Sequence, residues 1–444
     1  MASLSLFSPP PPRPATLQAL ADALVKNSHL QELSLSGHAM SVASAAALAA
    51  ALQENGALQA LAVGTPATGN AALKVLCAGV AQSRSLCKLD VANRGATGAH
   101  GGRALGAACC PMSRLESLDA SRNALGDDGV AAFAQAMAVL PDLAAMNERA
   151  AARAVERIES PVFERLRLSG VGLGDRGAEA LARALQVRCA LVGLWLADNE
   201  ELGEVGLRRL VSTAPLLETL DVSGTRTGAG PTGEWLERAA ASGALKELTI
   251  ARSGLAGTPV ARLADGLAAA GCVLATLDAS GNEGIGDGGA GCIAAAMDRE
   301  GCVLRSLDLS ECGLGAAGAE LLCRAGSGLH RLGLRGNSLG DEGAQAVAAA
   351  LGEAVEMDLR ELSVAACGVG ATGCEALCGA LAAGAAPQLE TLEMGGNEAA
   401  QGGVEEGEED PTRARWSAAV AALREARPKL DVHWKAGERG GGVE

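Results

Sequence analysis

The sequence predicts an α/β solenoid: a right-handed α/β horseshoe with a parallel inner sheet, outer helices and about thirteen repeats. Three observations lead to this fold. One pattern, L-x-x-L-x-L-x-x-N/C-x-L-G-x-x-G-A, returns along nearly the whole chain of 444 residues. Each copy joins a short run of alternating leucines, typical of a strand, to a longer helix-like segment. The composition has 48% hydrophobic but only 2% aromatic residues, together with 59 glycines, which suits thin layers of small side chains.

The copies of the pattern are regularly spaced. Successive copies begin 25 to 30 residues apart, except for a gap of 48 residues between Leu115 and Phe163. A period of this length marks a repeat architecture, in which each unit buries its apolar face only against its neighbours. The first positions of the copies are Leu30, Leu58, Leu86, Leu115, Phe163, Leu191, Leu217, Leu245, Leu274, Leu304, Leu329, Leu359 and Leu389.

A single repeat shows how the pattern builds its strand and helix. In the copy that begins LRSLDLS at Leu304, Leu307 and Leu309 alternate with polar residues, so we expect the leucines to face the core. The polar or thiol side chain at Cys312 is expected to turn inward and to satisfy backbone groups where the strand ends. Glycines then allow a tight turn, and G-A-x-x-L begins the helix. Residues matching Cys312 are Asn123, Asn199, Asn282, Asn337, Cys367 and Asn397.

These repeats resemble those of the leucine-rich repeat proteins. The clearest copies are LRSLDLSECGLGAAGAELL from Leu304 and LHRLGLRGNSLGDEGAQAV from Leu329. The period near 28 residues, with room for a full helix in each repeat, is similar to that of the ribonuclease-inhibitor-like subclass. The resemblance covers about Leu17 to Trp434. The repeats also resemble the repeat domain of Ran GTPase-activating proteins, which share this repeat type.

A glycine motif tests the alternative of a dinucleotide-binding enzyme. Gly172, Gly174 and Gly177 spell G-x-G-x-x-G between a strand-like run and a helix-like run, as in a turn that binds pyrophosphate. The same motif occurs at the same place in two other repeats, from Gly313 and from Gly368. A dinucleotide-binding fold carries its fingerprint once. The motif is therefore interpreted as the turn of the repeat.

The ends of the chain depart from the pattern. Solenoids need caps on their terminal repeats, and at the C-terminal end Trp416 and Trp434 are expected to cover the open apolar edge. Within the final repeat, the acidic run GGVEEGEED is either a solvated insertion or a docking strip for a basic partner. The expected organisation is a disordered Pro-rich segment over 1–15, a capping helix over 16–29, repeats over 30–411, a cap over 412–435 and a disordered tail over 436–444.

The long gap after Leu115 predicts a helical insertion near residues 139–162. Arg149, Arg153 and Arg157 are four residues apart and would form one row on this helix. Like charges in a row slightly disfavour an isolated helix. The row is therefore either solvated or in contact with an acidic partner.

Charge and cysteine usage exclude several classes of function. A net charge of −15 argues against nucleic acid as a partner and favours attraction to basic protein surfaces. The 13 cysteines and 5 histidines show no metal-ligand or catalytic spacing, so we expect no enzyme activity, metal or cofactor. Scattered cysteines are typical of reduced thiols in a cytoplasmic protein. No apolar run is long enough to span a membrane.

The exposed strand positions are the candidate binding surface. Asp90, Asp119, Asp221, Asp278 and Asp308 occupy the central exposed position, where they either attract a basic partner or are simply solvated. The same face is predicted to carry Arg165, Arg167 and Trp195, with the row of Arg149, Arg153 and Arg157 extending it. Arginine and tryptophan are enriched at binding hot spots. Trp195 is either such an anchor or packs on neighbouring strand side chains.

Three functional classes remain open. We predict a non-enzymatic, protein-binding scaffold that uses the concave face of the repeats. The alternative is a Ran-type GTPase-activating protein, for which the resemblance implies an arginine-bearing loop; Arg94 and Arg103 lie in the corresponding region, although the surrounding family motif is not recognisable. The third is the ligand-sensing arm of an innate-immunity-type receptor, but the chain shows no nucleotide-binding module. The partner is expected to be a protein, either basic or a small GTPase.

Overall fold

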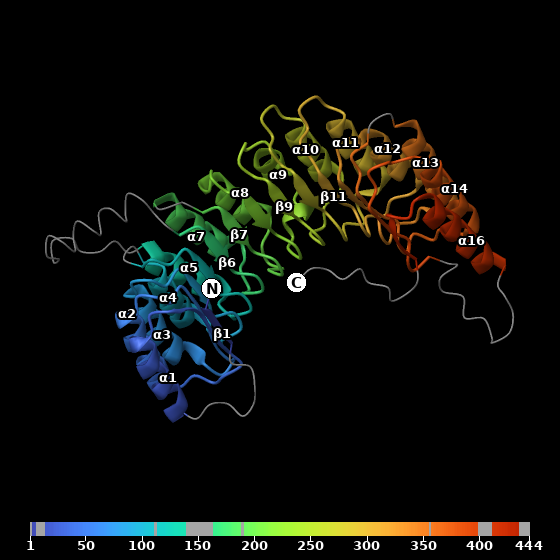
Figure 1. Cartoon of the computed structure of the whole chain (residues 1–444). Coiled ribbons are helices and arrows are strands. Elements are labelled where there is room, and N and C mark those ends of the chain that lie inside the picture. Colours follow the sequence, from blue (N-terminus) through green and yellow to red (C-terminus); the bar gives the residue numbers. More distant parts are fainter. Residues whose placement is uncertain are drawn as a thin grey trace. The chain divides into compact units, whose positions relative to one another are not determined.

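A computed structural model describes residues 2–5, 14–110, 113–138, 163–187, 191–354, 357–397 and 411–434. The chain divides into two units, Met1–Arg226 and Thr227–Glu444. In each unit short parallel strands alternate with helices, and the helices lie along one side of the strands (Figure 1). The predicted fold class, an α/β solenoid of repeats, is confirmed.

The first unit contains strands β1 to β8, each hydrogen-bonded in parallel to the next in chain order. The strands are β1 (Ala2–Ser5), β2 (Leu30–Ser36), β3 (Ala60–Gly64), β4 (Lys88–Asp90), β5 (Ser117–Asp119), β6 (Arg165–Arg167), β7 (Gly193–Trp195) and β8 (Thr219–Asp221). The helices are α1 (Pro14–Lys26), α2 (Val42–Glu54), α3 (Gly69–Ala81), α4 (Gly98–Ala108), α5 (Gly126–Ala138), α7 (Asp175–Val187) and α8 (Glu204–Thr213).

The second unit repeats this arrangement with strands β9 to β15. The strands are β9 (Glu247–Thr249), β10 (Thr276–Asp278), β11 (Ser306–Asp308), β12 (Arg331–Gly333), β13 (Glu361–Ser363), β14 (Thr391–Glu393) and β15 (Asp431–His433). The helices are η2 (Thr227–Ala229), α9 (Glu234–Ala240), α10 (Gly257–Leu267), α11 (Gly286–Met297), α12 (Ala316–Ala325), α13 (Gly340–Glu353), α14 (Ala371–Ala382) and α16 (Pro411–Ala426).

The core of each unit follows the leucine register that the sequence predicts. In the first unit the central strand leucines pair in one continuous row, and each of them is buried. The members of this row are Leu33, Leu61, Leu89, Leu118, Leu166, Leu194 and Leu220. Because alternate strand residues point to opposite faces, the residues on either side of each leucine face away from the helices.

A ladder of asparagines supports the turns after the strands, as predicted. The Asn337 amide group donates to the carbonyls of Leu309 and Leu334, both at 2.8 Å. Its oxygen accepts the backbone N–H groups of Cys312 and Leu314, at 2.9 and 3.0 Å. In the repeat before it, the Cys312 thiol donates to the carbonyls of Ala279 and Ser310, at 3.2 and 3.4 Å. Each asparagine therefore fastens its own repeat to the preceding one.

The glycine motif has a different role from the one it plays in a dinucleotide-binding fold. The backbone N–H groups of Gly174 and Gly177 both donate to Oδ1 of Asp127, at 2.7 and 2.9 Å. Asp127 belongs to α5, the helix of the preceding repeat, whereas the two glycines open α7. The anion-binding helix N-terminus is thus occupied by a carboxylate of the protein itself. The same arrangement joins Asp175 to Gly203 and Gly206, Asp287 to Gly315 and Gly318, and Asp341 to Gly370 and Gly373.

The ends differ in part from the sequence expectation. Residues 1–15 were expected to be disordered, but Ala2–Ser5 form β1 on the edge of β2. The reason is visible in the register, because Leu4 pairs with Leu33 and so imitates a repeat strand. At the other end Trp416 and Trp434 are both buried and stack with their ring centroids 6.4 Å apart. The expected insertion over 139–162, with Arg149, Arg153 and Arg157, and the acidic run over 402–410 lie outside the described residues.

Candidate protein-binding surface

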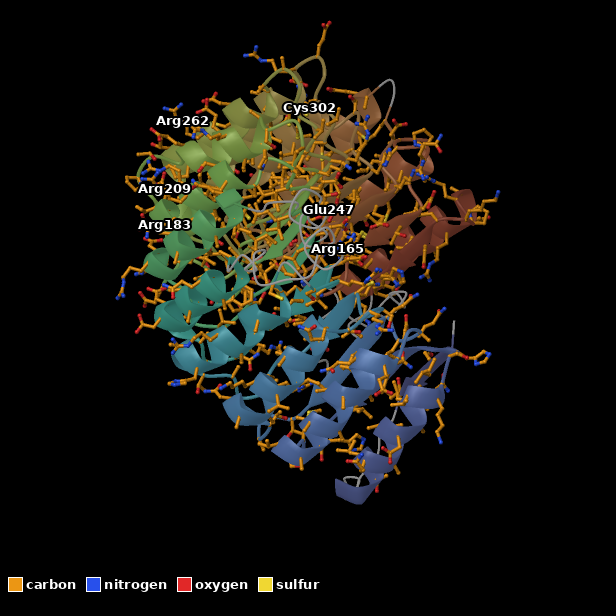
Figure 2. The ribbon with its side chains drawn as sticks, turned by 90° about the vertical axis from the view of Figure 1, so that its left-hand side faces the viewer. Arg165, Arg183, Arg209, Glu247, Arg262 and Cys302 are labelled. Carbon is orange, nitrogen blue, oxygen red and sulfur yellow. The ribbon has the colours of Figure 1, made fainter. Side chains whose placement is uncertain are left out.

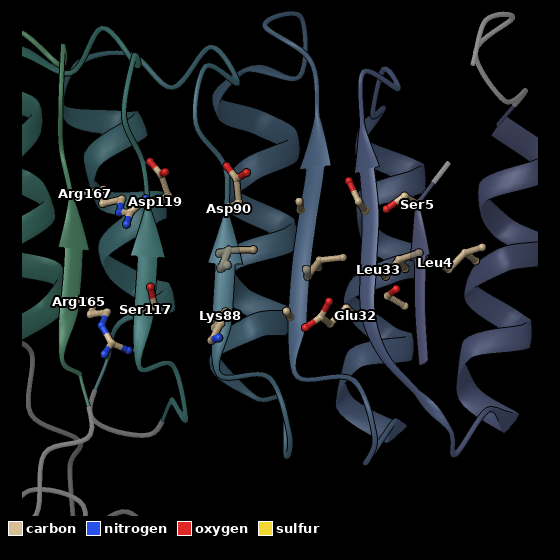
Figure 3. Close-up of a pocket in the computed structure, with 16 residues that line it drawn as sticks. Leu4, Ser5, Glu32, Leu33, Lys88, Asp90, Ser117, Asp119, Arg165 and Arg167 are labelled. Atoms are coloured by element: carbon tan, nitrogen blue, oxygen red, sulfur yellow. The ribbon is translucent and has the colours of Figure 1, made fainter. Parts of the chain in front are cut away.

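A cavity of about 540 Å³ lies on the exposed strand face of the first unit. Its lining runs from β1 to β6 and carries charged groups of both signs, including Lys88, Asp90, Asp119, Arg165 and Arg167 (Figure 3). Arg165 lies at the strands, whereas Arg183 and Arg209 lie on the helices α7 and α8 (Figure 2). The structure therefore brings together the predicted residues Asp90, Asp119, Arg165 and Arg167.

Trp195 lies beside this cavity and is stacked on an arginine. The guanidinium carbon of Arg167 is 4.3 Å from the Trp195 ring centroid, a cation–π contact across the adjacent strands β6 and β7. The ring also covers Gly193 of its own strand: an added Cβ at Gly193 would meet the ring at 2.5 Å. Trp195 is only partly exposed. The sequence predicted its face correctly but not this stack, which depends on the side-chain conformations of Arg167 and Trp195 on neighbouring strands.

The predicted aspartates have a structural role that sequence reasoning missed. Each accepts the backbone N–H group of the residue two positions later, at 2.9 to 3.0 Å, and so supports the turn after its strand. The signal that could have revealed this is the recurrent spacing D-x-S or D-x-A. These aspartates are Asp90, Asp119 and Asp221 in the first unit and Asp278 and Asp308 in the second. The other carboxylate oxygen, Oδ2, has no described role in this turn.

Trp195 and Asp221 hold paired positions on β7 and β8. The Asp221 carboxylate is further held by the Ser223 hydroxyl, which donates to it at 2.7 Å. Asp278 and Asp308 pair with each other on β10 and β11 of the second unit. The predicted site residues thus divide between the two units, with the tryptophan and both arginines in the first.

Arg94 is engaged within the fold. Its guanidinium donates to the carbonyls of Val63 and Asn93 and to the Ser36 hydroxyl, and so links three consecutive repeats. Burial lowers the pKa of Arg94, while the nearby carboxylates of Asp90 and Asp119 act in the opposite direction. Arg103, the other arginine of this region, is exposed on helix α4. The two arginines therefore occupy different environments, and Arg94 is held by internal hydrogen bonds.

The described cysteines carry free thiols, and most of them are buried. Burial raises the pKa of Cys77, Cys312 and Cys323 to about 12. These thiols therefore stay protonated near neutral pH, when they are poor nucleophiles. Within the described ranges, no cluster of three or more His, Cys, Asp or Glu side chains could hold a metal ion. No helix in the part of the chain that the structure covers is both long and apolar enough to cross a membrane.

Comparison with known proteins identifies the repeats. A family model described as "Leucine Rich repeat" matches residues 26–49, 114–134, 302–323, 329–348 and 357–378. Ribonuclease inhibitor from Sus scrofa is 29% identical over 257 residues, which cover 50% of this chain and 56% of the relative. The chain carries leucine-rich repeats and is similar to the ribonuclease inhibitors. Ribonuclease inhibitor from Mus musculus is similar to the same extent, at 28% identity over 256 residues.

The leucine-rich repeat chain spans about half the length of these curated relatives. Among solved structures, it is similar to a chain in the crystal structure of the Rad7 and Elc1 complex from yeast, with a TM-score of 0.51. That alignment covers 94% of this chain and 91% of the other, at 16% sequence identity. At this identity the likeness shows the fold alone.

Proposed function

We propose that this leucine-rich repeat protein is a non-enzymatic scaffold that binds a protein partner on the exposed strand face of its repeats. In the first unit the anchor is the pair of Trp195 and Arg167. The observation that carries this proposal is the stacked ring and guanidinium beside a cavity of about 540 Å³. Tryptophan and arginine dominate binding energies at protein interfaces. The curated relatives, whose name denotes inhibition of another protein, support a protein as the partner.

The charges of the protein favour a partner that has both a basic surface and carboxylates. The net charge of −15 would speed the approach of a basic protein surface, and the arginines of the first unit would then pair with its carboxylates. The thiols of the described cysteines favour a reducing compartment, which we propose to be the cytoplasm. The Ran GTPase-activating alternative loses one of its two candidate arginines, because Arg94 is committed to hydrogen bonds within the fold, whereas Arg103 is exposed on helix α4.

The test is the affinity of an isolated partner for one variant of the anchor and for one control variant. A partner captured by the wild-type protein and identified by mass spectrometry would be titrated against Trp195→Ala and against Arg183→Ala as control. Arg183 is exposed on helix α7, where it pairs with Glu179, and lies away from the strands. We expect Trp195→Ala to weaken binding by about 2 kcal/mol or more, roughly 30-fold, with the control unchanged.

A second variant moves the ring without removing it. A Cβ added by Gly193→Ala would meet the Trp195 ring at 2.5 Å, so the ring must shift from its place against Arg167. Binding should weaken for this variant also. Wild-type affinity in both Trp195→Ala and Gly193→Ala would rule out the anchor. A large loss of melting temperature in Trp195→Ala would mean that the ring serves the fold instead.

A further inference from the structure

Two cations of the first unit flank an uncharged hydroxyl on three adjacent strands. Lys88 on β4 pairs in register with Ser117 on β5, and Ser117 pairs with Arg165 on β6. All three line the cavity and lie at one level of the strands (Figure 3). Lys88 and Arg165 are exposed. Among the described residues, neither cation has an ion pair or a side-chain hydrogen bond, and the Ser117 hydroxyl has no partner either.

The same level of the second unit shows how such a cation is normally balanced. Arg331 on β12 and Glu361 on β13 pair in register and form an ion pair, with 3.7 Å between nitrogen and oxygen. Opposite charges at paired positions of neighbouring strands stabilise a sheet. At the corresponding place between Lys88 and Arg165, the chain has a serine where a carboxylate would neutralise both cations.

Other acidic groups near the cavity have different neighbours. Asp90 and Asp119 lie on the same strands as Lys88 and Ser117, one exposed position further along. One oxygen of each supports a turn, and both carboxylates act on the half-buried Arg94. Glu32 is the acidic group at the level of Lys88, but it is two strands away, with Ala60 between them. Glu116, which precedes Ser117, acts on the Cys87 thiol. Among the described residues no carboxylate, including that of Glu164, forms an ion pair with Lys88 or Arg165, so an external anion can take this place.

We propose that Lys88, Ser117 and Arg165 form a subsite for a single oxyanion presented by the protein partner, either a phosphorylated side chain or a carboxylate. Neighbouring strands lie about 4.8 Å apart, so the two cations stand roughly 10 Å apart at the backbone. An oxyanion above Ser117 would accept from the ammonium, the hydroxyl and the guanidinium together. Such charge-assisted hydrogen bonds are the strong ones. This subsite rests on the proposed function and specifies the chemistry that the strand face recognises.

The first test uses small probes on the full-length protein. Inorganic phosphate and three pentapeptides, Gly-Gly-X-Gly-Gly with X as phosphoserine, glutamate or serine, would be titrated by calorimetry at low salt, with the N-terminus of each peptide acetylated and its C-terminus amidated so that X carries the only anion. We expect the phosphoserine peptide and phosphate to bind and the serine peptide not to bind. Binding of the glutamate peptide as tight as that of the phosphoserine peptide would identify a carboxylate as the source, and weaker binding a phosphate.

Four variants and a control sharpen this test. Lys88→Ala and Arg165→Ala should each weaken anion binding about tenfold, since each removes a charge-assisted hydrogen bond. Ser117→Glu places a carboxylate between the cations and should abolish binding while the melting temperature stays equal or rises. Glu32→Gln removes the nearest acid at this level and should tighten binding. Lys74→Ala changes the net charge by the same amount as Lys88→Ala but lies exposed on helix α3, and should have no effect.

The outcome separates the subsite from the scaffold proposal. The subsite is wrong if no anion binds the wild-type protein, or if Ser117→Glu binds anions as well as the wild-type protein does. With an isolated partner, weakening by Trp195→Ala but not by Lys88→Ala or Arg165→Ala would keep the scaffold and remove the subsite. Full affinity in all three variants would remove both. Circular dichroism of each variant checks that the fold is retained.

Discussion

The carboxylate of Asp341 caps a helix that belongs to the next repeat: its Oδ1 accepts the backbone N–H group of Gly370 at 2.7 Å. The same oxygen accepts the N–H group of Gly373 at 2.8 Å. Asp341 itself lies in the first turn of α13, whereas Gly370 precedes α14. One side chain therefore satisfies two amides that α14 cannot satisfy by itself.

Removal of this cap should lower stability. We expect Asp341→Ala to reduce the free energy of unfolding by about 1–2 kcal/mol, because two amides lose a charged acceptor. Glu342→Ala is the matched control: Glu342 is exposed in the same turn and has no described partner. Urea unfolding would measure both. Equal losses in the two variants would show that the inter-repeat bond contributes nothing.

A left-handed alanine offers a stabilising change. Ala366 has a φ of 53°, a conformation that glycine adopts at no steric cost. We expect Ala366→Gly to raise the free energy of unfolding by about 0.5–1 kcal/mol. Ala349→Gly, at an exposed position within α13, should instead lower it by about 1 kcal/mol. Thermal or urea unfolding of both variants would check the opposite signs; a loss in Ala366→Gly would contradict the backbone argument.

The asparagine ladder predicts a graded series at one position. Asn337→Ala removes a buried side chain that makes four hydrogen bonds, and should cost more than about 2 kcal/mol of stability. Asn337→Cys should cost less, because Cys312 holds the equivalent position and still donates to a carbonyl. Urea unfolding orders the two variants. A cysteine variant as unstable as the alanine variant would mean that the thiol donor is worth little here.

Buried thiols predict a loss of stability at alkaline pH. Burial raises the pKa of Cys323 to about 12, so the folded protein keeps a proton that the unfolded chain releases at about 8.5. The contribution of Cys323 is complete below about pH 8.5 and falls as the pH rises toward 12, by about 1.4 kcal/mol per unit. Unfolding measured at pH 8 and pH 10 should show a smaller decrease in Cys323→Ala than in the wild-type protein. An identical decrease in both would contradict this linkage.

The leucine spacing was sufficient to predict the core. Leu307 and Leu309 are buried as their alternation requires, because side-chain direction in a strand depends only on local sequence. The turns were predicted less completely. The glycine expected after Cys312 is indeed left-handed, with a φ of 69° at Gly313, but the left-handed conformation of Glu311 just before Cys312 was not predicted. That conformation is imposed by bonds to the neighbouring repeat and has no local signature.

For the candidate site, the sequence predicted which residues are exposed on the strand face but not which of them contact one another. Arg165, Arg167 and Trp195 lie on the strand face as expected, but the stack of Trp195 on Arg167 depends on side-chain conformations that strand alternation does not determine. Lys88 and Ser117 were not singled out, because neither is unusual until Arg165 is placed beside them. The turn-supporting role of Asp308 was also missed, although the recurrent D-x-S spacing carries a signal for it.

The bond from Asp341 to Gly370 also bears on how such a chain can grow in evolution. A repeat that carries an aspartate for its successor and a pair of glycines for its predecessor keeps both halves of the bond when it is copied whole. Tandem duplication in register therefore inherits working joints. A long insertion can also leave the joint intact, because Asp127 still accepts the N–H groups of Gly174 and Gly177 although residues 139–162 lie between them in the chain. Selection on duplicated repeats would therefore preserve this aspartate–glycine bond before any surface residue evolved to bind another protein.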